Sequence, residues 1–445
     1  MGLPERYEAR VSRRRLREHA PEALPYPDRP PGTDCLPEVR HIVVLMMENH
    51  SFDNYLGCAG RGDGLPDGAS NPRLDGTPVA AHHFSSTQQA VGVPTQSWAA
   101  THWQWANGAN SGFASAVERF SPGGDPGRAM GFWTDADLPF YHSLARTFPV
   151  ADRWFASCLG PTIPNRRFLV AGTALGLTTD RVSHCFDYPP GGTIFDLLSR
   201  HGITWADYHS VSPVRPLLSH VGGWYGHRAA RRAWKWAERA IGRDSGEAKS
   251  YLQFTADAFP LGIVRYLRHL RTVDRFVADA ASGQLPAVSF VDPDFHADSE
   301  ENPQDISFGE ALSARVIRAA MHGANWMGTL LIWCYDEHGG YYDHVPPPEA
   351  VEPDDRRPDS DDGARFDRLG FRVPAVIVSP YARPGYVSHV VRDHTSVLKL
   401  IERKWNLPPL TARDAAADDL LDAVDFASPP AFATPPELAG PLRGS

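Results

Sequence analysis

The segment from residue 40 to residue 57 constrains the fold more than any other part of this chain. Its first part, His41–Met47, is almost wholly apolar and partly β-branched. Such a run is typical of a central strand buried on both faces of a sheet. Glu48 and Asn49 follow where the strand ends, and in open parallel sheets ligands bind just outside the carboxyl ends of strands. We therefore take this pair as the first candidate site, although Asn49 also suits a simple turn or helix cap.

Further short apolar runs alternate with helical patterns along the chain. The predicted strands are residues 203–208, 287–291, Thr329–Tyr335 and 375–379, with 150–155 as strand or extended chain. The predicted helices are 138–148, 193–200, 312–322 and 394–404. This alternation favours an α/β fold in which helices cover both faces of a mostly parallel sheet. Polar residues follow several of these runs directly, as Glu48 does, and they are His209, Asp292, Asp336 and Glu337.

Residues 160–167 predict a helix terminus. Pro164 is tolerated in a first helical turn, and residues 168–174 continue the helical pattern, which places Thr162 at the amino end. That end presents unpaired N–H groups and the positive end of the helix dipole, so it favours a phosphate. The alternative is that Thr162 only caps the helix.

The densest group of candidate residues is Asp336–His344, which contains Asp336, Glu337, His338, Asp343 and His344. Neighbouring acids after a buried strand repel one another and lose hydration, so a positive group must neutralise them. A metal ion would do this. The alternative is an acidic surface turn, against which the two tyrosines at 341 and 342 argue.

Composition and charge exclude several classes of protein. The chain has 445 residues and a net charge of −9, so we expect no nucleic-acid partner. Its five cysteines have no C-x-x-C spacing, which indicates neither a zinc ribbon nor a complete disulfide framework. No apolar run is long enough to span a bilayer. The charged, proline-rich amino terminus lacks a signal peptide, which predicts a cytoplasmic protein unless the true start lies upstream.

Four motifs together resemble the bacterial phosphoesterase family, which groups phosphocholine-type phospholipases C with an acid phosphatase of respiratory-burst-inhibiting type. They are Met-Glu-Asn-His-Ser-Phe-Asp-Asn-Tyr-Leu-Gly (47–57), Gly-Pro-Thr-Ile-Pro-Asn-Arg (160–166), Asp-Glu-His-Gly-Gly-Tyr-Tyr-Asp-His-Val (336–345) and Asp-His-Thr-Ser-Val-Leu (393–398). The similarity runs in order from about residue 40 to Phe426. It implies a three-layer, alkaline-phosphatase-like α/β/α sandwich.

The resemblance also implies the site. By matching motifs, Glu48, Asn49, Asp336 and Glu337 would hold one divalent metal ion, and Thr162 stands where the family carries its Ser or Thr nucleophile. These oxygen ligands suit Ca²⁺, Mg²⁺ or Mn²⁺, with Zn²⁺ also allowed. His102 and His209 are the candidates for acid, base or phosphate contact. His338 and His344 equally suit a role in orienting the acids. No organic cofactor is expected.

The expected organisation is one catalytic domain with additions. We expect an extended arm at 1–38, a single phosphoesterase domain at 39–428 and a proline-rich tail at 429–445. A basic, aromatic insertion at about 219–251 looks like a cap that touches anionic or lipid head groups, but it equally suits an exposed helix whose two tryptophans pack inward.

The substrate is less well defined by the sequence. We expect a phospholipase C acting through a phospho-threonine on a small-molecule or phospholipid phosphoester. The alternatives are an acid phosphatase-like phosphomonoesterase and a non-catalytic, metal-dependent binding protein. Relatives commonly carry a His-Pro-Pro where this chain has Asn302-Pro303, so contacts to the distal part of the substrate differ. Trp98, Trp103 and Trp105 suit a cage for a quaternary ammonium, or core packing. The oligomeric state stays open.

Overall fold

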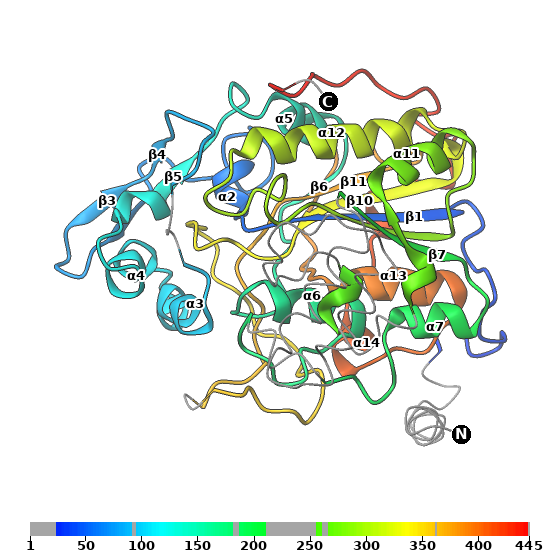
Figure 1. The fold of residues 1–445 in the computed structure, drawn as a ribbon, viewed down its shortest axis with the longest axis horizontal. Coiled ribbons are helices and arrows are strands. Elements are labelled where there is room, and N and C mark those ends of the chain that lie inside the picture. The colour runs from blue at the N-terminus through cyan, green and yellow to red at the C-terminus, as the bar shows by residue number, and fades with distance from the viewer. Residues whose placement is uncertain are drawn as a thin grey trace, which may run out of the picture.

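The core of the computed structural model is an eight-stranded sheet (Figure 1). The structure describes residues 24–90, 95–180, 187–210, 255–259, 266–360 and 363–443. The strand order is β12-β6-β11-β10-β1-β9-β7-β8. The strands are β1 His41–Met47, β6 Val150–Ala151, β7 Trp205–His209, β8 Leu270–Thr272, β9 Val288–Asp292, β10 Thr329–Tyr335, β11 Ala375–Val378 and β12 Val387–Ser388.

The central strands run parallel, so their carboxyl ends meet at one edge of the sheet. β1 lies between β10 and β9, with Met47 opposite Tyr335 and Leu45 opposite Val291. β9 also pairs in parallel with β7, where Asp292 lies opposite His209. β11 alone of the strands in this sheet runs antiparallel to its neighbours β10 and β6. The register therefore brings the polar residues that end or follow β1, β10, β9 and β7 to one place.

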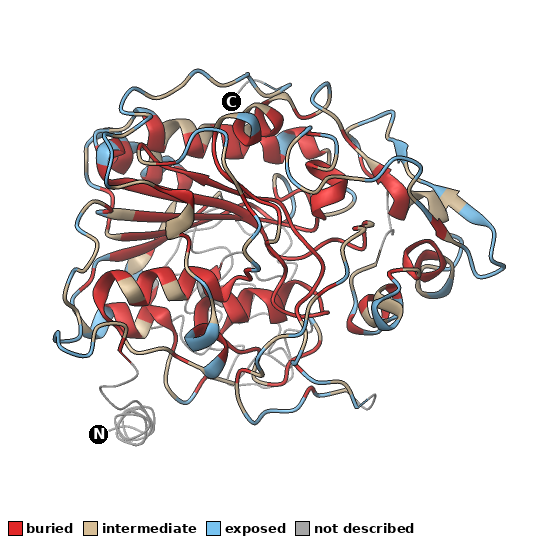
Figure 2. Cartoon of the chain, turned by 180° about the vertical axis from the view of Figure 1, so that it is seen from behind, coloured by how far each residue is buried: buried red, intermediate tan, exposed pale blue. Residues whose placement is uncertain are grey.

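Helices cover both faces of this sheet, which makes three layers (Figure 1). The helices over one face are α5 Pro139–Thr147, α11 Val273–Ala281 and α12 Ile306–His322. Those over the other are α6 Thr162–Ala171, α7 Ile194–Arg200, α13 Thr395–Trp405 and α14 Ala412–Ala416. Figure 2 shows the enclosed strands buried along almost their whole length. The predicted mostly parallel α/β/α sandwich is confirmed.

Small elements extend beside one end of the sheet. They are α2 Phe52–Tyr55, α3 Trp98–Trp105, α4 Phe113–Phe120 and the short strands β2 Ser70–Pro72, β3 Pro78–Ala80, β4 His82–His83 and β5 Gly131–Phe132. β2 pairs with β3, and β4 pairs with β5, apart from the main sheet. The sequence predicted long loops for much of this region, and these strands of two or three residues are its short regular parts.

Some element boundaries differ from the predicted ones. β7 and β9 lie slightly later than expected, so His209 and Asp292 end their strands instead of following them. α12 begins at Ile306, six residues before the predicted start, because the Asp305 carboxylate accepts the Ser307 N–H at 3.1 Å and caps the helix. α6 ends at Ala171 and not at 174, because Gly172 has a left-handed φ of 68° that terminates the helix.

The segments near both ends of the chain pack against the sandwich. The Tyr26 N–H donates to Asn406 Oδ1 at 2.8 Å, and the Gly32 N–H donates to the Trp405 carbonyl at 2.8 Å. In the carboxyl-terminal segment, the Phe432 carbonyl accepts the Trp326 indole N–H at 2.8 Å. The predicted insertion at 219–251 lies outside the described residues. Across the parts of the chain that the structure describes, none of the helices has the length and apolar character that crossing a membrane requires.

Candidate active site

The ends of β1 and β10 bring four of the predicted site residues together. The backbone N–H groups of Asn49 and Glu337 both donate to Asp336 Oδ1, at 3.1 and 2.7 Å. The absence of a side chain at Gly339 lets the two loops approach each other, because a Cβ atom added there would lie 1.9 Å from the Asn49 carbonyl oxygen. Gly339 also has a left-handed φ of 65°. Only glycine therefore allows this approach.

Several carboxylate oxygens at the ends of β1 and β10 have no hydrogen-bond donor among the described residues. Glu48, Asp336 and Glu337 are all fully buried, and burial raises the pKa of each. The negative charge of Asp336 raises the pKa of Glu48 and of Glu337 further. Within the described residues, both side-chain oxygens of Glu48 and Oε1 of Glu337 have no hydrogen-bond partner. Buried carboxylate oxygens of this kind need a positive ligand.

Arg166 on α6 is the cation that the protein itself supplies. Its Nη1 lies 2.7 Å from Asp292 Oδ1, its Nε 3.3 Å from Asp336 Oδ2 and its Nη2 3.6 Å from Glu48 Oε1. Burial disfavours the guanidinium charge, but the surrounding carboxylates outweigh burial and raise the pKa of Arg166. One arginine thus faces three acids. The sequence analysis missed Arg166, although its position four residues after Thr162 places both on one helix face.

Thr162 begins α6 and lies against the same group of residues. Its hydroxyl is 3.4 Å from Asn49 Oδ1, a long contact that leaves the hydroxyl weakly held. We call Glu48, Asn49, Asp336 and Glu337, with Thr162 and Arg166, the Thr162 centre. All five residues predicted as metal ligands or nucleophile belong to it.

Asp180 already occupies part of the helix terminus that the sequence analysis gave to a phosphate. Its Oδ1 accepts the Ile163 N–H at 2.8 Å. Asp180 as a residue is exposed, but its carboxyl group lies among many protein atoms. This desolvation raises its pKa to about 7. Glu301 is a second acid near the centre, and burial followed by the charges of Asp180 and Asp336 raises its pKa to about 7. Neither acid stood out in the sequence.

The two predicted acid-base histidines lie on different elements. His209 ends β7 opposite Asp292, and burial lowers its pKa to about 4, so its imidazole is neutral at pH 7. His102 lies on α3, where its Nδ1 is 2.8 Å from the Trp98 carbonyl and its ring packs on the Trp98 ring. A Cβ atom on Gly160 would lie 3.2 Å from Trp98, so α3 covers the loop that leads to Thr162.

Two buried histidines orient the acids of the Thr162 centre. His338 Nδ1 lies 3.4 Å from Glu337 Oε2, and its Nε2 lies 2.9 Å from Gln104 Oε1. His394, which the sequence analysis placed only in a motif, has Nε2 2.7 Å from the Asp336 carbonyl oxygen. Burial lowers the pKa of His338 to about 3 and of His394 to about 4. Both rings are therefore neutral at pH 7. His338 is hydrogen-bonded to Gln104 and lies beside Glu337, and His394 is hydrogen-bonded to the backbone of Asp336.

His344 belongs to a different group, which we call the Arg372 cluster: Asp53, Asp343, His344 and Arg372. Ligand atoms of its two acids and its histidine lie within 4.8 Å of one another, a spacing that a metal ion could use. Arg372 fills this role instead, with Nη2 3.0 Å from Asp53 Oδ1 and Nε 2.8 Å from Asp343 Oδ1. His344 thus orients Asp53 and not an acid of the Thr162 centre.

The three tryptophans of α3 do not form one cage. Trp98 packs with Phe168 and Phe366, whereas Trp105 packs with the group around Phe113. The ring face of Trp103 is covered by the Arg119 guanidinium at 4.4 Å, and that of Trp105 by Arg368 at 4.5 Å. Two of the ring faces therefore already contact a cation of the protein, and core packing explains the third.

Comparisons with known proteins show what the whole chain is similar to. The chain is 31% identical over 436 residues to phospholipase C B of Mycobacterium tuberculosis, covering 89% of this chain and 79% of that protein. It is 29% identical to non-specific phospholipase C6 of Arabidopsis thaliana, covering 92% of this chain and 76% of that protein. Among solved structures, an alkaline phosphatase superfamily protein of Vibrio parahaemolyticus aligns over 94% of this chain and 78% of that one, with 9% identity and a TM-score of 0.36.

A family model matches most of the chain. The model of the Phosphoesterase family covers residues 39–408, which include every residue of the Thr162 centre. The chain therefore belongs to the Phosphoesterase family and is a hydrolase that acts on phosphoric ester bonds.

Proposed function

We propose that this protein is a metal-dependent phosphoesterase of phospholipase C type, in which Thr162 is the nucleophile. The observation that carries the proposal is the set of buried, unpartnered oxygens of Glu48 and Glu337 beside a hydroxyl at a helix amino terminus. The relatives named as phospholipases C support the substrate class.

The residues of the Thr162 centre fit one divalent cation. Glu48, Asn49, Asp336 and Glu337 would hold it, since all offer oxygen and two of them have oxygens without a donor. The Arg372 cluster is the weaker candidate, because Arg372 already neutralises its acids. When bound, such an ion neutralises charge on the phosphoryl oxygens and lowers the pKa of a neighbouring hydroxyl.

In the proposed reaction the oxygen of Thr162 attacks phosphorus in line with the leaving alcohol. As the bond between Thr162 Oγ1 and phosphorus forms, the hydroxyl proton passes to solvent. The bond from phosphorus to the alcohol oxygen breaks, and that oxygen takes a proton from a histidine. The charge of Arg166 and the positive end of the α6 dipole favour the negative phosphoryl group, although Asp180 already accepts the Ile163 N–H. Water then attacks the phospho-threonine, releases the phosphoryl group and restores the Thr162 hydroxyl.

The histidines divide the proton transfers. Burial lowers the pKa of His209 to about 4, so its ring is neutral at pH 7 and is the candidate that accepts a hydrogen bond from the attacking water, although the same shift makes it a weak base. His102 on α3 is the candidate that gives the leaving alcohol its proton. His338 and His394 contact the acids, so they position the site and do not take part in proton transfer.

The Thr162→Ala variant tests this proposal. Removing the nucleophile should lower turnover of chromogenic phosphocholine and phenyl phosphate esters by about 10⁴-fold or more. The midpoint of thermal unfolding should hardly change, because within the described residues the hydroxyl makes a single, long hydrogen bond of 3.4 Å. Thr162→Ser is the matched control, since it keeps a hydroxyl and should retain measurable turnover.

Two alternatives give different results in the same assays. A phosphomonoesterase of acid phosphatase type would hydrolyse phenyl phosphate in preference to the phosphocholine ester. A non-catalytic binding protein would turn over neither ester with Ca²⁺, Mg²⁺, Mn²⁺ or Zn²⁺, and Thr162→Ala would leave its affinity for phosphate esters unchanged. Full turnover by Thr162→Ala would exclude the covalent mechanism.

A further inference from the structure

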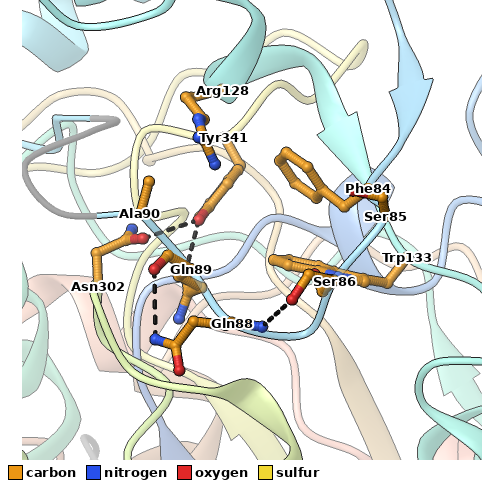
Figure 3. Close-up of a pocket in the computed structure, with 10 residues that line it drawn as sticks. All are labelled: Phe84, Ser85, Ser86, Gln88, Gln89, Ala90, Arg128, Trp133, Asn302 and Tyr341. Carbon is orange, nitrogen blue, oxygen red and sulfur yellow. Dashed lines mark hydrogen bonds between the residues drawn. The ribbon is translucent and has the colours of Figure 1, made fainter.

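A pocket beside the Thr162 centre has no role in the reaction proposed above. It is a small pocket that opens to solvent, with a cavity volume of about 50 Å³. Its walls combine aromatic rings, amide groups and one arginine (Figure 3). The lining residues that matter here are Phe84, Arg128, Trp133, Asn302 and Tyr341.

The pocket adjoins the Thr162 centre through two short connections. Tyr341 lies four residues after Glu337, and its ring stacks on that of His50 with centroids 4.9 Å apart. His50 itself follows Asn49. On the other side, the charge of Asp336 contributes to the raised pKa of Glu301. The next residue, Asn302, lines the pocket. These contacts place the pocket close to the residues that flank the Thr162 centre.

The rings form an apolar wall. The centroids of Phe84 and Trp133 lie 4.6 Å apart, and those of Trp133 and Tyr341 lie 6.1 Å apart. Trp133 is fixed, because its indole N–H donates to the Ser86 carbonyl at 3.0 Å. Figure 3 shows Phe84 and Trp133 on one side of the pocket and Asn302 on the other. The wall suits the carbon skeleton of a small ligand.

The polar side has a cation that is only loosely paired. Among the described residues Arg128 forms an ion pair with Asp125, with Nε and Oδ2 4.0 Å apart and the two side chains 40% and 71% exposed. The positive charge of Arg128 acts on the Tyr341 hydroxyl and partly offsets the rise in its pKa that burial causes. That hydroxyl donates to Gln89 Oε1 at 2.6 Å and contacts Asn302 Oδ1 at 3.2 Å, which leaves the Asn302 amide N–H groups as donors. A guanidinium and an amide both donate to anions.

We propose that this pocket binds a negatively charged group, such as a carboxylate, on the part of the substrate beyond the phosphoryl group. Arg128 and Asn302 contact the charge, and the rings of Phe84 and Trp133 contact the skeleton that carries it. A quaternary ammonium is disfavoured there, since Arg128 would repel it. This inference rests on the proposed function for the position of the phosphoryl group.

Two probes that differ in a single group test the proposal. 3-Phosphoglycerate and glycerol 3-phosphate share a phosphate and a skeleton, but the first ends in a carboxylate and the second in a hydroxymethyl group. Calorimetric titration should show about tenfold tighter binding of 3-phosphoglycerate, as one charge-assisted hydrogen bond supplies. Arg128→Met should remove this difference. Arg119→Met is the matched control, an exposed arginine on α4 outside the pocket, and should keep it.

The outcomes separate this proposal from the proposed function. Equal affinity of the two probes for the wild-type protein, or a difference that survives in Arg128→Met, would overturn the pocket assignment, whatever the turnover of phenyl phosphate. An Arg128-dependent difference in a protein without turnover would support the pocket while the proposed function fails. Loss of the difference in Arg119→Met as well would show a general charge effect and overturn the assignment.

Discussion

The Thr162 centre and the Arg372 cluster both contain buried acids from the loops after β1 and β10, but the protein satisfies only one of them. In the Arg372 cluster every carboxylate oxygen has a donor. Asp53 accepts from Arg372 and from both N–H groups of His344, and Asp343 accepts from Arg372 and from the backbone of Val345 and Asp53. In the Thr162 centre three oxygens have none among the described residues.

This difference separates structure from function. Charges that meet donors of the protein itself hold loops together and need no ligand. Charges without donors lower the stability of the empty protein, and such groups persist where a ligand completes them. The difference supports our proposal that a cation binds at the Thr162 centre, whereas the Arg372 cluster joins the segments that carry its acids.

The largest expected effect tests the structural half of the comparison. Arg372→Met leaves Asp53 and Asp343 facing each other without a cation, and it should lower the free energy of unfolding by about 3–5 kcal/mol. Urea denaturation measures this loss. Arg146→Met is the control, since Arg146 pairs with Asp135 on the surface and should contribute less than about 1 kcal/mol. Equal losses would mean that Arg372 is not essential to its cluster.

A smaller effect tests the functional half. A divalent cation at 100 times its dissociation constant should stabilise the wild-type protein by about 2.7 kcal/mol, because it binds the folded chain only. Thermal unfolding with EDTA and with Mg²⁺, Ca²⁺, Mn²⁺ or Zn²⁺ measures the shift. Glu337→Gln should abolish the shift, and Asp343→Asn should keep it. The reverse result would place the cation in the Arg372 cluster.

The pH dependence of stability sharpens this test. Because burial raises the pKa of Glu337, the folded protein binds this proton more readily than the unfolded chain does. The resulting stability is present below the ordinary value of 4.5 and is lost as pH rises through the raised pKa. A cation competes with the proton, so its stabilising shift should grow between pH 5 and pH 8.

Glu337→Gln provides the reference for that pH series. Its thermal midpoint should depend less on pH than that of the wild-type protein when EDTA is present. His344 has a raised pKa, because the hydrogen bond and charge of Asp53 outweigh burial, so it too loses stability as pH rises. That loss is common to both proteins and cancels in their difference. A cation shift that does not change with pH would argue against carboxylate ligands.

The sequence predicted the sheet edge well because its signal is local. The boundaries of β1 and β10 match the prediction, and the acids that follow them lie together as their buried, parallel strands require. The sequence analysis could not tell which acids meet an arginine. Arg372 contacts Asp53 across 319 positions of the chain, and Arg166 contacts Asp336 across 170. Pairings of that range depend on the whole packing and have no local pattern.

The smallest expected effect concerns the border of the Arg372 cluster. Asp63 contacts His344 Nε2 at 3.2 Å and Arg153 at 2.7 Å, but its side chain is 39% exposed. Water screens such pairs, so Asp63→Asn should lower the free energy of unfolding by less than about 1 kcal/mol. The contact from Arg372 to the Asp63 carbonyl is retained, because it involves only the backbone. Asp53→Asn, measured beside it in urea, should lose several times more, since Asp53 is buried and accepts from three donors. Similar losses for the two variants would mean that the charge network extends to the surface, and the contrast between a satisfied interior cluster and an incomplete one would no longer hold.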